Sequence, residues 1–157
     1  MDSSFPASVC ACASLRRASR AVCHLYDLVL APTKLKVTQF VILRTIGEAG
    51  EIAHCDLARY FAASEETFSR RLASARASGW VSMKIGSRGR RVYALTEQGA
   101  RMLELATPYW ERAQERMRRE LGEPEWSVLY GFAERLTQAA LRAEQTRSAN
   151  GRPRTAA

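Results

Sequence analysis

Residues 54–95 read HCDLARYFAASEETFSRRLASARASGWVSMKIGSRGRRVYAL, and this stretch decides the fold. Leu57 and Ala58 share one side of a short predicted helix at its start. Ser64 is a favoured N-cap and opens a second helix, whose first turn carries two acids where the helix dipole favours negative charge. Gly79 ends that helix, so the two helices and their tight connection have the spacing of a helix-turn-helix.

The segment that follows predicts a β-hairpin. WVSMKIG and RRVYAL both alternate as strands do, and SRG between them supplies a turn, so the hairpin covers residues 80–95. A helix-turn-helix followed by such a hairpin is a winged helix. The hairpin concentrates four positive charges, with no acid before Glu97: Lys84, Arg88, Arg90 and Arg91. Because a solvated surface normally intersperses both signs of charge, we interpret this wing as a nucleic-acid-binding element.

Amphipathic helices are predicted before this segment. Apolar residues recur at spacings of three and four along the first helix, which Pro32 ends. These residues are Leu15, Ala18, Val22, Leu25 and Val29. Thr38 then has the character of an N-cap for a second helix through QFVILRTIGEAG.

Two long helices are predicted after the hairpin. Thr96 is expected to cap the first, and the second starts near Pro124, a favoured first helical position. Their inward residues are Leu103, Ala106, Trp110, Ala113 and Met117 in the first, and Trp126, Leu129, Phe132, Leu136 and Ala140 in the second. The outer helices carry more apolar surface than a small winged helix can cover, which predicts a homodimer in which they interlace.

The sequence therefore predicts a mainly α fold with a small β-hairpin wing, in which a winged helix-turn-helix is joined to a helical dimerisation layer from both termini. We expect the winged helix-turn-helix DNA-binding domain at residues 36–96 and the helical dimerisation region at 10–32 and 97–145. Residues 1–9 and 146–157 are small, polar and interrupted by Pro or Gly, so both are expected to be disordered tails.

Composition narrows the class of protein. The 157 residues carry a net charge of +8, an excess that most often indicates a polyanionic partner, nucleic acid before membrane surface. No apolar run approaches the ~18 residues of a membrane span. The Met1 end lacks a secretory signal, so we expect a cytoplasmic protein without membrane contact. Gly-rich phosphate loops, His-Glu-x-x-His and serine elbows are absent, so we expect no catalysis, cofactor or bound metal.

Three stretches resemble the MarR family of bacterial transcriptional regulators. LKVTQFVILRTI is similar to the family's second helix, and LARYFAASEETFSRRLASARASGWV resembles its helix-turn-helix, with Arg70 in the recognition helix. RRVYALTEQG is similar to the second wing strand and the Leu-Thr-x-x-Gly that begins the fifth helix. The order and spacing of the three stretches carry the resemblance.

The resemblance implies a homodimer that binds a pseudo-palindromic double-stranded DNA operator, usually repressing transcription until a small phenolic or similar ligand, or an oxidant, weakens binding. The recognition helix would enter the major groove and the basic wing the minor groove. The expected DNA-contacting residues are Ser64, Thr67, Ser69, Arg70 and Arg71 in the helix, and Lys84, Arg88, Arg90 and Arg91 in the wing. The alternative is a protein-interaction module whose winged helix binds an acidic partner.

Two departures from the family pattern leave details open. Many members carry Asp-x-Arg-x in the wing where this chain has SRGR, residues 87–90, so the arginine that enters the minor groove is undecided. Glu65 and Glu66 stand where many members place small or basic contact residues. We expect at least one of them to stabilise the helix N-terminus with its charge and to point away from DNA. The alternative is that one of these carboxylates accepts a hydrogen bond from the N4 amino group of a cytosine.

The family's pocket commonly lies between the dimer helices and the winged helix, which makes five residues candidates for binding an effector. They are His24, Tyr26, Phe40, Tyr109 and Trp110. The competing interpretation is that the aromatic side chains belong to the core, as aromatics at helical spacing most often do. The two histidines, His24 and His54, are expected on the surface or in the core rather than as ligands.

Three of the four cysteines lie in ASVCACASLRRASRAVCHLYD, residues 7–27. In a helix that begins at Ser8, Cys12 and Cys23 are about 16 Å apart at 1.5 Å per residue. One metal ion cannot be shared across that distance. A disulfide between Cys10 and Cys12 is disfavoured too, because residues i and i+2 point to different sides of a helix.

Two interpretations of these cysteines remain. In the first, they are small apolar residues near a dimer seam, with Cys23 and Cys55 packed. In the second, Cys10, Cys12 and Cys23 are a redox sensor, because a helix N-terminus followed by arginines is the electropositive setting that favours thiol oxidation.

Overall fold

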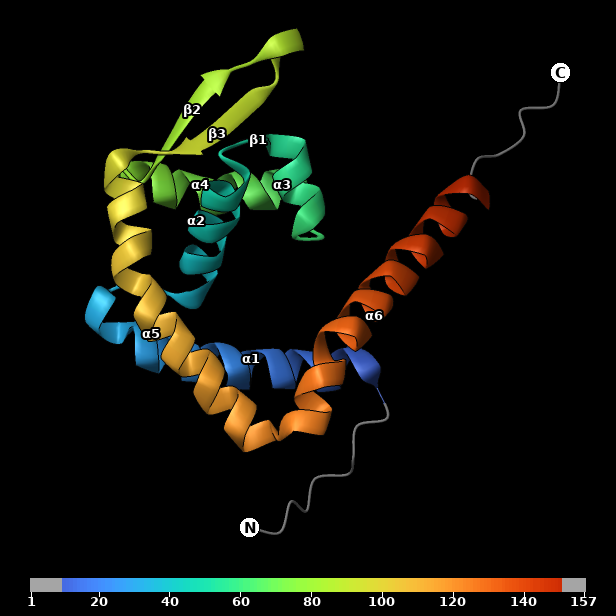
Figure 1. Cartoon of the computed structure of the whole chain (residues 1–157). Coiled ribbons are helices and arrows are strands. Elements are labelled where there is room, and N and C mark those ends of the chain that lie inside the picture. The colour runs from blue at the N-terminus through green and yellow to red at the C-terminus, as the bar shows by residue number, and fades with distance from the viewer. Residues whose placement is uncertain (1–9, 151–157) are drawn as a thin grey trace, which may run out of the picture. The chain divides into compact units, whose positions relative to one another are not determined.

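The computed structural model describes residues 10–150 (Figure 1). Its contacts divide the chain into two units, Met1–Met117 and Arg118–Ala157. In chain order the elements are α1 (Ala11–Leu30), η1 (Ala31–Thr33), α2 (Val37–Ala49), β1 (Glu51–Ala53), α3 (His54–Tyr60), α4 (Glu65–Ala77), β2 (Val81–Ile85), η2 (Ser87–Gly89), β3 (Arg91–Leu95), α5 (Glu97–Leu121) and α6 (Glu123–Asn150).

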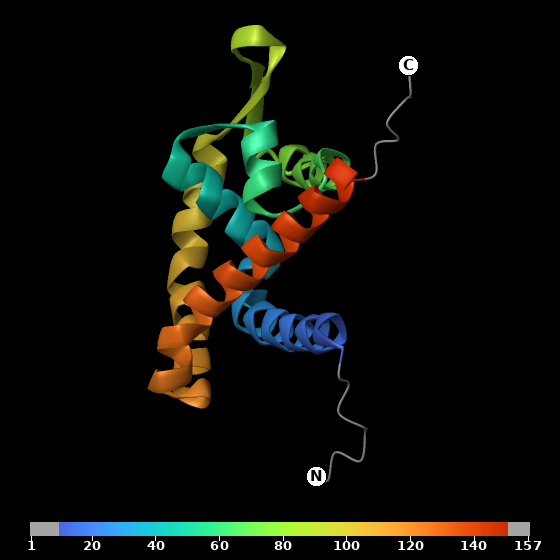
Figure 2. The ribbon, with the colours of Figure 1, turned by 90° about the vertical axis from the view of Figure 1, so that its right-hand side faces the viewer.

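The predicted winged helix-turn-helix is confirmed in the first unit. Helices α3 and α4 form the helix-turn-helix, and β2 and β3 form the antiparallel hairpin, with Met83 opposite Tyr93. Strand β1, which the sequence did not predict, pairs with the other edge of β3 and places Ile52 opposite Tyr93. In Figures 1 and 2 the hairpin projects away from the helices, at the opposite end of this unit from α1.

The connection between α3 and α4 is a tight turn through Ala62. This residue has a positive φ of 45°, and its N–H donates to the carbonyl of Arg59 at 3.0 Å. Ser64 follows as the N-cap of α4, as predicted, because its Oγ accepts the Thr67 N–H at 3.2 Å. The turn and the cap together fix the angle at which α4 leaves α3.

The core of the first unit joins α2, α3 and α4 beneath the sheet. Phe40, Leu43, Leu57 and Phe68 are fully buried in one apolar cluster. Phe61 stacks on Phe68 with ring centroids 5.1 Å apart and closes the cluster at the end of α3. Burial of these large side chains is the main driving force that holds α4 against the rest of the unit.

The start of α2 differs from the prediction. Its N-cap is Lys36, two residues before Thr38, and Lys36 has no side-chain acceptor to cap the helix. The free N–H groups are satisfied instead by Asp27 Oδ1, which accepts from Val37 at 2.7 Å, and by Gln39 Oε1, which accepts from Lys36 at 3.0 Å. The prediction of Thr38 was wrong because the cap comes from α1, which local sequence does not reveal.

Helix α1 begins at Ala11, and its predicted apolar face is only partly covered within this chain. Tyr26 and Leu30 at its C-terminal end are buried, whereas Leu15 and Val22 are 44% and 38% exposed. The N-terminal half of the predicted face therefore lacks a partner within the described part of this chain.

Helix α5 starts as predicted. Thr96 Oγ1 accepts the Gly99 N–H at 3.0 Å and donates to the carbonyl of Gly79 at 2.6 Å, which ties α5 to the end of α4. A Cβ on Gly99 would lie 1.9 Å from the carbonyl oxygen of Trp80, so only glycine lets the backbone of α5 come this close to Trp80. The Leu-Thr-x-x-Gly motif thus docks α5 onto the helix-turn-helix.

The second unit contains the end of α5 and all of α6. Arg118 donates two hydrogen bonds to the Glu123 carboxylate, at 2.7 and 2.8 Å. The guanidinium holds the pKa of this carboxyl below its ordinary value. Helix α6 runs to Asn150, so the tail predicted from residue 146 was wrong as far as 150; residues 1–9 and 151–157 lie outside the described residues.

The apolar residues of α6 are not buried within this chain. Leu129 and Phe132, both predicted to point inward, are 40% and 55% exposed, and Val128 and Tyr130 are exposed as well. A helix cannot cover its own apolar side chains, so these residues need a partner to be removed from water.

None of the described helices is long and apolar enough to cross a membrane.

Candidate nucleic-acid interface

Helix α4 presents a polar face opposite its buried one. Phe68 and Leu72 are buried against α3 and the core, and Glu66 and Arg70 lie on the opposite side, both exposed. Arg70 Nη2 is 4.0 Å from Glu66 Oε1, a loose pair one helical turn apart that water screens. Arg71 is exposed as well. The two arginines are therefore available to an anionic partner along α4.

Two of the predicted contact residues form intramolecular hydrogen bonds. Ser64 Oγ is engaged as the N-cap, where it also donates to Thr67 Oγ1 at 2.9 Å. Ser69 is half-buried, and its Oγ lies 3.2 Å from Nε2 of His54. Thr67 is half-buried at the first turn of α4. Among the predicted recognition-helix residues, Ser64, Arg70 and Arg71 are exposed, and of these Ser64 is engaged in the cap.

His54 is a buried polar residue at the junction of α3 and α4. It is 3% exposed, and its Nε2 lies 3.1 Å from the Glu65 carbonyl oxygen and 3.9 Å from the Glu65 carboxylate. Its Nδ1 is buried without a hydrogen-bond partner in the described part of the chain. The ring packs between Phe68 and Tyr93, at centroid distances of 6.3 and 5.7 Å. His54 thus links the start of α4 to the wing strand β3.

The wing tip is formed by a short turn with an arginine in the left-handed region. Arg88 has φ 58° and is followed by Gly89 at φ 71°. The Gly86 N–H donates to the Arg90 carbonyl at 2.8 Å and closes the turn. The three wing arginines, Arg88, Arg90 and Arg91, are all exposed, and none has an acidic partner within residues 10–150.

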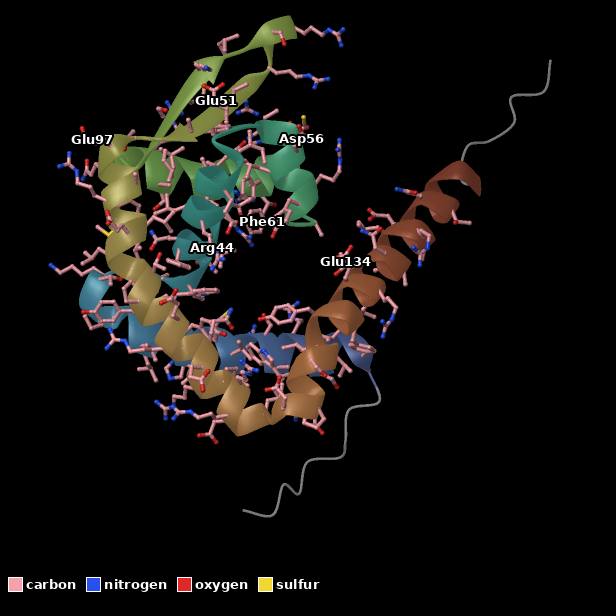
Figure 3. All side chains as sticks on the ribbon, in the orientation of Figure 1. Arg44, Glu51, Asp56, Phe61, Glu97 and Glu134 are labelled. Carbon is pink, nitrogen blue, oxygen red and sulfur yellow. The ribbon has the colours of Figure 1, made fainter. Side chains whose placement is uncertain are left out.

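Lys84 differs from these arginines because it is paired. Its Nζ forms a short ion pair with Glu51 Oε1, and Glu51 lies on β1, beside the hairpin (Figure 3). No local sequence pattern predicts this pair, because β1 was not predicted and the partners are 33 residues apart. The wing's positive charges without an acidic partner among the described residues are therefore those of Arg88, Arg90 and Arg91.

Comparison with solved structures identifies the family. The structure matches the crystal structure of the M. tuberculosis transcriptional regulator MosR in complex with DNA, with a TM-score of 0.77 and 30% sequence identity, over 85% of this chain and 98% of MosR. This chain belongs to the MarR family. A second MosR crystal structure gives 0.73 at 30% identity, over 86% of this chain and 98% of that one.

The fold is also that of MarR itself. A mutant of E. coli MarR complexed with operator DNA matches with a TM-score of 0.70 at 18% identity, over 78% of this chain and 89% of that chain. No protein-family model matches the sequence, and no curated protein matches it either. The MarR family consists of winged-helix transcriptional regulators, and this chain has their winged helix-turn-helix.

The five predicted effector residues differ in burial and in their neighbours in this MarR-family chain. His24 is exposed, and Tyr26 is buried with its hydroxyl donating to Gln114 Oε1 at 2.5 Å. Phe40 is fully buried and stacks on Trp110 with centroids 5.6 Å apart. Of the five, only Trp110 lines the groove between α2 and α5, whose volume is about 510 Å³.

The cysteines are all free thiols. Cys10 precedes α1 in an extended conformation and Cys12 lies in its first turn, and both are exposed, whereas Cys23 is half-buried against the core. Because α1 begins at Ala11 and not at Ser8, Cys10 lies before the helix, and helical geometry does not separate it from Cys12. Within residues 10–150 no three potential metal-ligating side chains are grouped.

Proposed function

We propose that this chain is a dimeric transcriptional repressor of the MarR type, which places α4 in the major groove and the wing in the minor groove of an operator. One observation carries the proposal: exposed arginines lie both on α4 and on the wing. The three wing arginines have no acidic partner among the described residues. The likeness to MosR in complex with DNA supports the same docking.

Arg70 is the residue proposed to read bases. It lies on the exposed face of α4, and a bidentate contact between an arginine and guanine contributes roughly 1–3 kcal/mol of discrimination. Thr67 and Arg71 flank it and would contact bases or phosphates. Ser64 and Ser69 are assigned supporting roles, because each already has an intramolecular hydrogen bond.

The wing arginines are proposed to contribute to DNA affinity more than to sequence specificity. Arg88 and Arg90 lie at the turn and would reach the minor groove, where a narrow A·T-rich stretch attracts arginine. Arg91, at the start of β3, would contact phosphates. Lys84 is already paired with Glu51 and would contribute less.

Dimerisation is proposed through the exposed apolar residues of the outer helices. In α1 these are Leu15, Val22 and Leu28, and in α6 they include Val128 and Phe132. A two-fold dimer would cover them and present two copies of α4 to successive major grooves, about 34–36 Å apart.

Regulation by an oxidant or a small ligand completes the proposal. Cys10 and Cys12 are exposed at the start of α1, with Arg16 and Arg17 close behind, which is a setting that favours thiol oxidation. If peroxide oxidises these thiols to a disulfide with a cysteine of the partner subunit, the crosslink would alter the spacing of the two recognition helices. Replacing both by Ser should remove the effect of peroxide on operator binding, and an unchanged effect would exclude these thiols as the sensor.

A salt titration on a fragment of the gene's own upstream DNA tests the DNA-binding role. Binding should weaken steeply with salt, and Arg70→Ala and Arg90→Ala should each weaken it at least about tenfold. Arg101→Ala is the matched control, because Arg101 is an exposed arginine on α5 that pairs with Glu97. Equal affinity for random DNA at physiological salt would count against a sequence-specific regulator. Charge reversal at the wing that leaves DNA binding untouched would favour a protein-interaction module instead.

A further inference from the structure

Helix α4 carries an acid on its outward face. Four exposed residues recur at spacings of four, three and four on the side opposite Phe68 and Leu72, and they are Glu66, Arg70, Ala73 and Ala77. The two alanines are small, so this face can approach a partner closely. Glu66 and Arg70 are therefore the side chains that extend furthest from it.

The neighbouring acid, Glu65, faces another part of the molecule. Its carboxylate lies 3.9 Å from Nε2 of His54, at the start of α3, and its carbonyl oxygen lies 3.1 Å from the same nitrogen. Both acids are in the first turn of α4, where the helix dipole favours a negative charge. The dipole favours Glu65 and Glu66 alike, whereas only Glu66 shares the outward face with Arg70.

The contact between Glu66 and Arg70 leaves both groups available to a ligand. Glu66 Oε1 is 4.0 Å from Arg70 Nη2, which is beyond hydrogen-bond distance, and the side chains are 87% and 75% exposed. A pair this exposed contributes little to stability. Helix α4 thus presents a carboxylate, which only accepts hydrogen bonds, one turn from a guanidinium, which only donates them.

The major groove of DNA offers a carboxylate few partners. Phosphates repel it, and guanine presents acceptors at N7 and O6, as thymine does at O4. The donors on the base edges are the amino groups of cytosine N4 and adenine N6, and Asp or Glu is the usual acceptor for cytosine. Arginine has the opposite preference, because its N–H groups bind guanine N7 and O6.

We infer that Glu66 reads the operator sequence, by accepting a hydrogen bond from the N4 amino group of a cytosine close to the guanine that Arg70 binds. The inference rests on the proposed placement of α4 in the major groove. Four residues of helix span about 6 Å, roughly two base-pair steps, so the two bases lie within two base pairs of each other. Because phosphates repel its carboxylate, Glu66 also lowers affinity for random DNA, and both effects raise the ratio of specific to non-specific binding.

Selection of bound sequences from a randomised DNA duplex library by the full-length protein tests the inference. The wild type should enrich half-sites in which a cytosine lies within about two base pairs of a guanine. Glu66→Gln should replace that cytosine by adenine, because a glutamine amide binds adenine N6 and N7, and Glu66→Ala should accept any base there. The guanine should persist in both variants and be lost only in Arg70→Ala.

Titrations of the selected site and of random DNA give the magnitudes. Glu66→Ala should lose about 5- to 20-fold of the preference for cytosine at that position, and it should bind random DNA about 2- to 5-fold more tightly. Glu65→Gln is the matched control, because it removes the other carboxylate of the first turn of α4. It should keep the wild-type consensus sequence.

Three results would overturn the inference. The first is a consensus that neither Glu66 variant changes. The second is loss of the guanine instead of the cytosine in Glu66→Gln, because Glu66 would then only position Arg70. The third is an equal change of consensus in Glu65→Gln, because the effect would then belong to the helix N-terminus. Wild-type protein that enriches no sequence at all would refute the proposed function, and the inference with it.

Discussion

The imidazole of His54, at the start of α3, lies against the hydroxyl of Ser69 on α4, with 3.2 Å between Nε2 and Oγ. This contact, together with the Glu65 carbonyl 3.1 Å from the same nitrogen, joins the recognition helix to the buried interior. Ser69 therefore holds α4 in place from its inner side, while Arg70 next to it faces outward.

Ser69→Ala should accordingly reduce stability rather than specificity. Loss of one partly buried hydrogen bond costs about 0.5–1.5 kcal/mol of unfolding free energy. Urea denaturation measures that loss, and competition with random DNA measures specificity, which should be retained. Unchanged stability combined with lost specificity would mean that Ser69 contacts bases directly. Arg70→Ala should show the reverse pattern.

Ala62→Gly should stabilise the protein. Ala62 has a φ of 45°, and a left-handed conformation costs a residue with a Cβ roughly 1–2 kcal/mol, part of which the greater unfolded-state freedom of glycine cancels. We expect a net gain of about 0.5–1 kcal/mol in unfolding free energy. Ala63→Gly, next to it but without a positive φ, should give no gain. Equal effects at both positions would rule out strain at Ala62.

Gly99→Ala should have a large effect at the docking point of α5. The added Cβ would meet the Trp80 carbonyl oxygen at 1.9 Å, so the backbone must move, at a cost of about 2–4 kcal/mol. Gly131→Ala is the matched control, since its Cβ would meet only Arg135 at an ordinary 3.5 Å. In that exposed helical position alanine should stabilise by about 0.5–1 kcal/mol. Thermal unfolding of the two variants should move the Tm in opposite directions.

Glu51→Gln should strengthen DNA binding. It removes an acid beside the wing and frees Lys84 for a phosphate, which should raise affinity by several-fold and steepen the salt slope by about one unit. Titrations at several salt concentrations give both values. Glu120→Gln, which removes an exposed carboxylate near the C-terminal end of α5, controls for net charge. An unaltered slope would place Lys84 away from the DNA.

Local signals were enough to predict most of the fold. Ser64 and Thr96 act as caps through bonds to residues three positions on, so their neighbours in sequence reveal them. The start of α2 was missed because its cap, Asp27, is ten residues away on another helix.

The candidate site was predicted less completely, for the same reason. Arg70 and the wing arginines could be assigned from residue type and position alone. The roles of Ser69 and Lys84 could not, because they depend on His54 and Glu51, partners that only the folded chain brings close. The groove between α2 and α5 required Arg44 and Trp110 to meet across two helices.

The central claim is a symmetric dimer with α4 in the major groove, and hydroxyl-radical footprinting on the gene's upstream DNA tests it most directly. We expect two equivalent protected half-sites centred about 10 bp apart, flanked by protection from the wings, and lost in Arg70→Ala. A single unsymmetrical footprint would contradict the claim. So would binding at physiological salt that protects no particular site on the DNA.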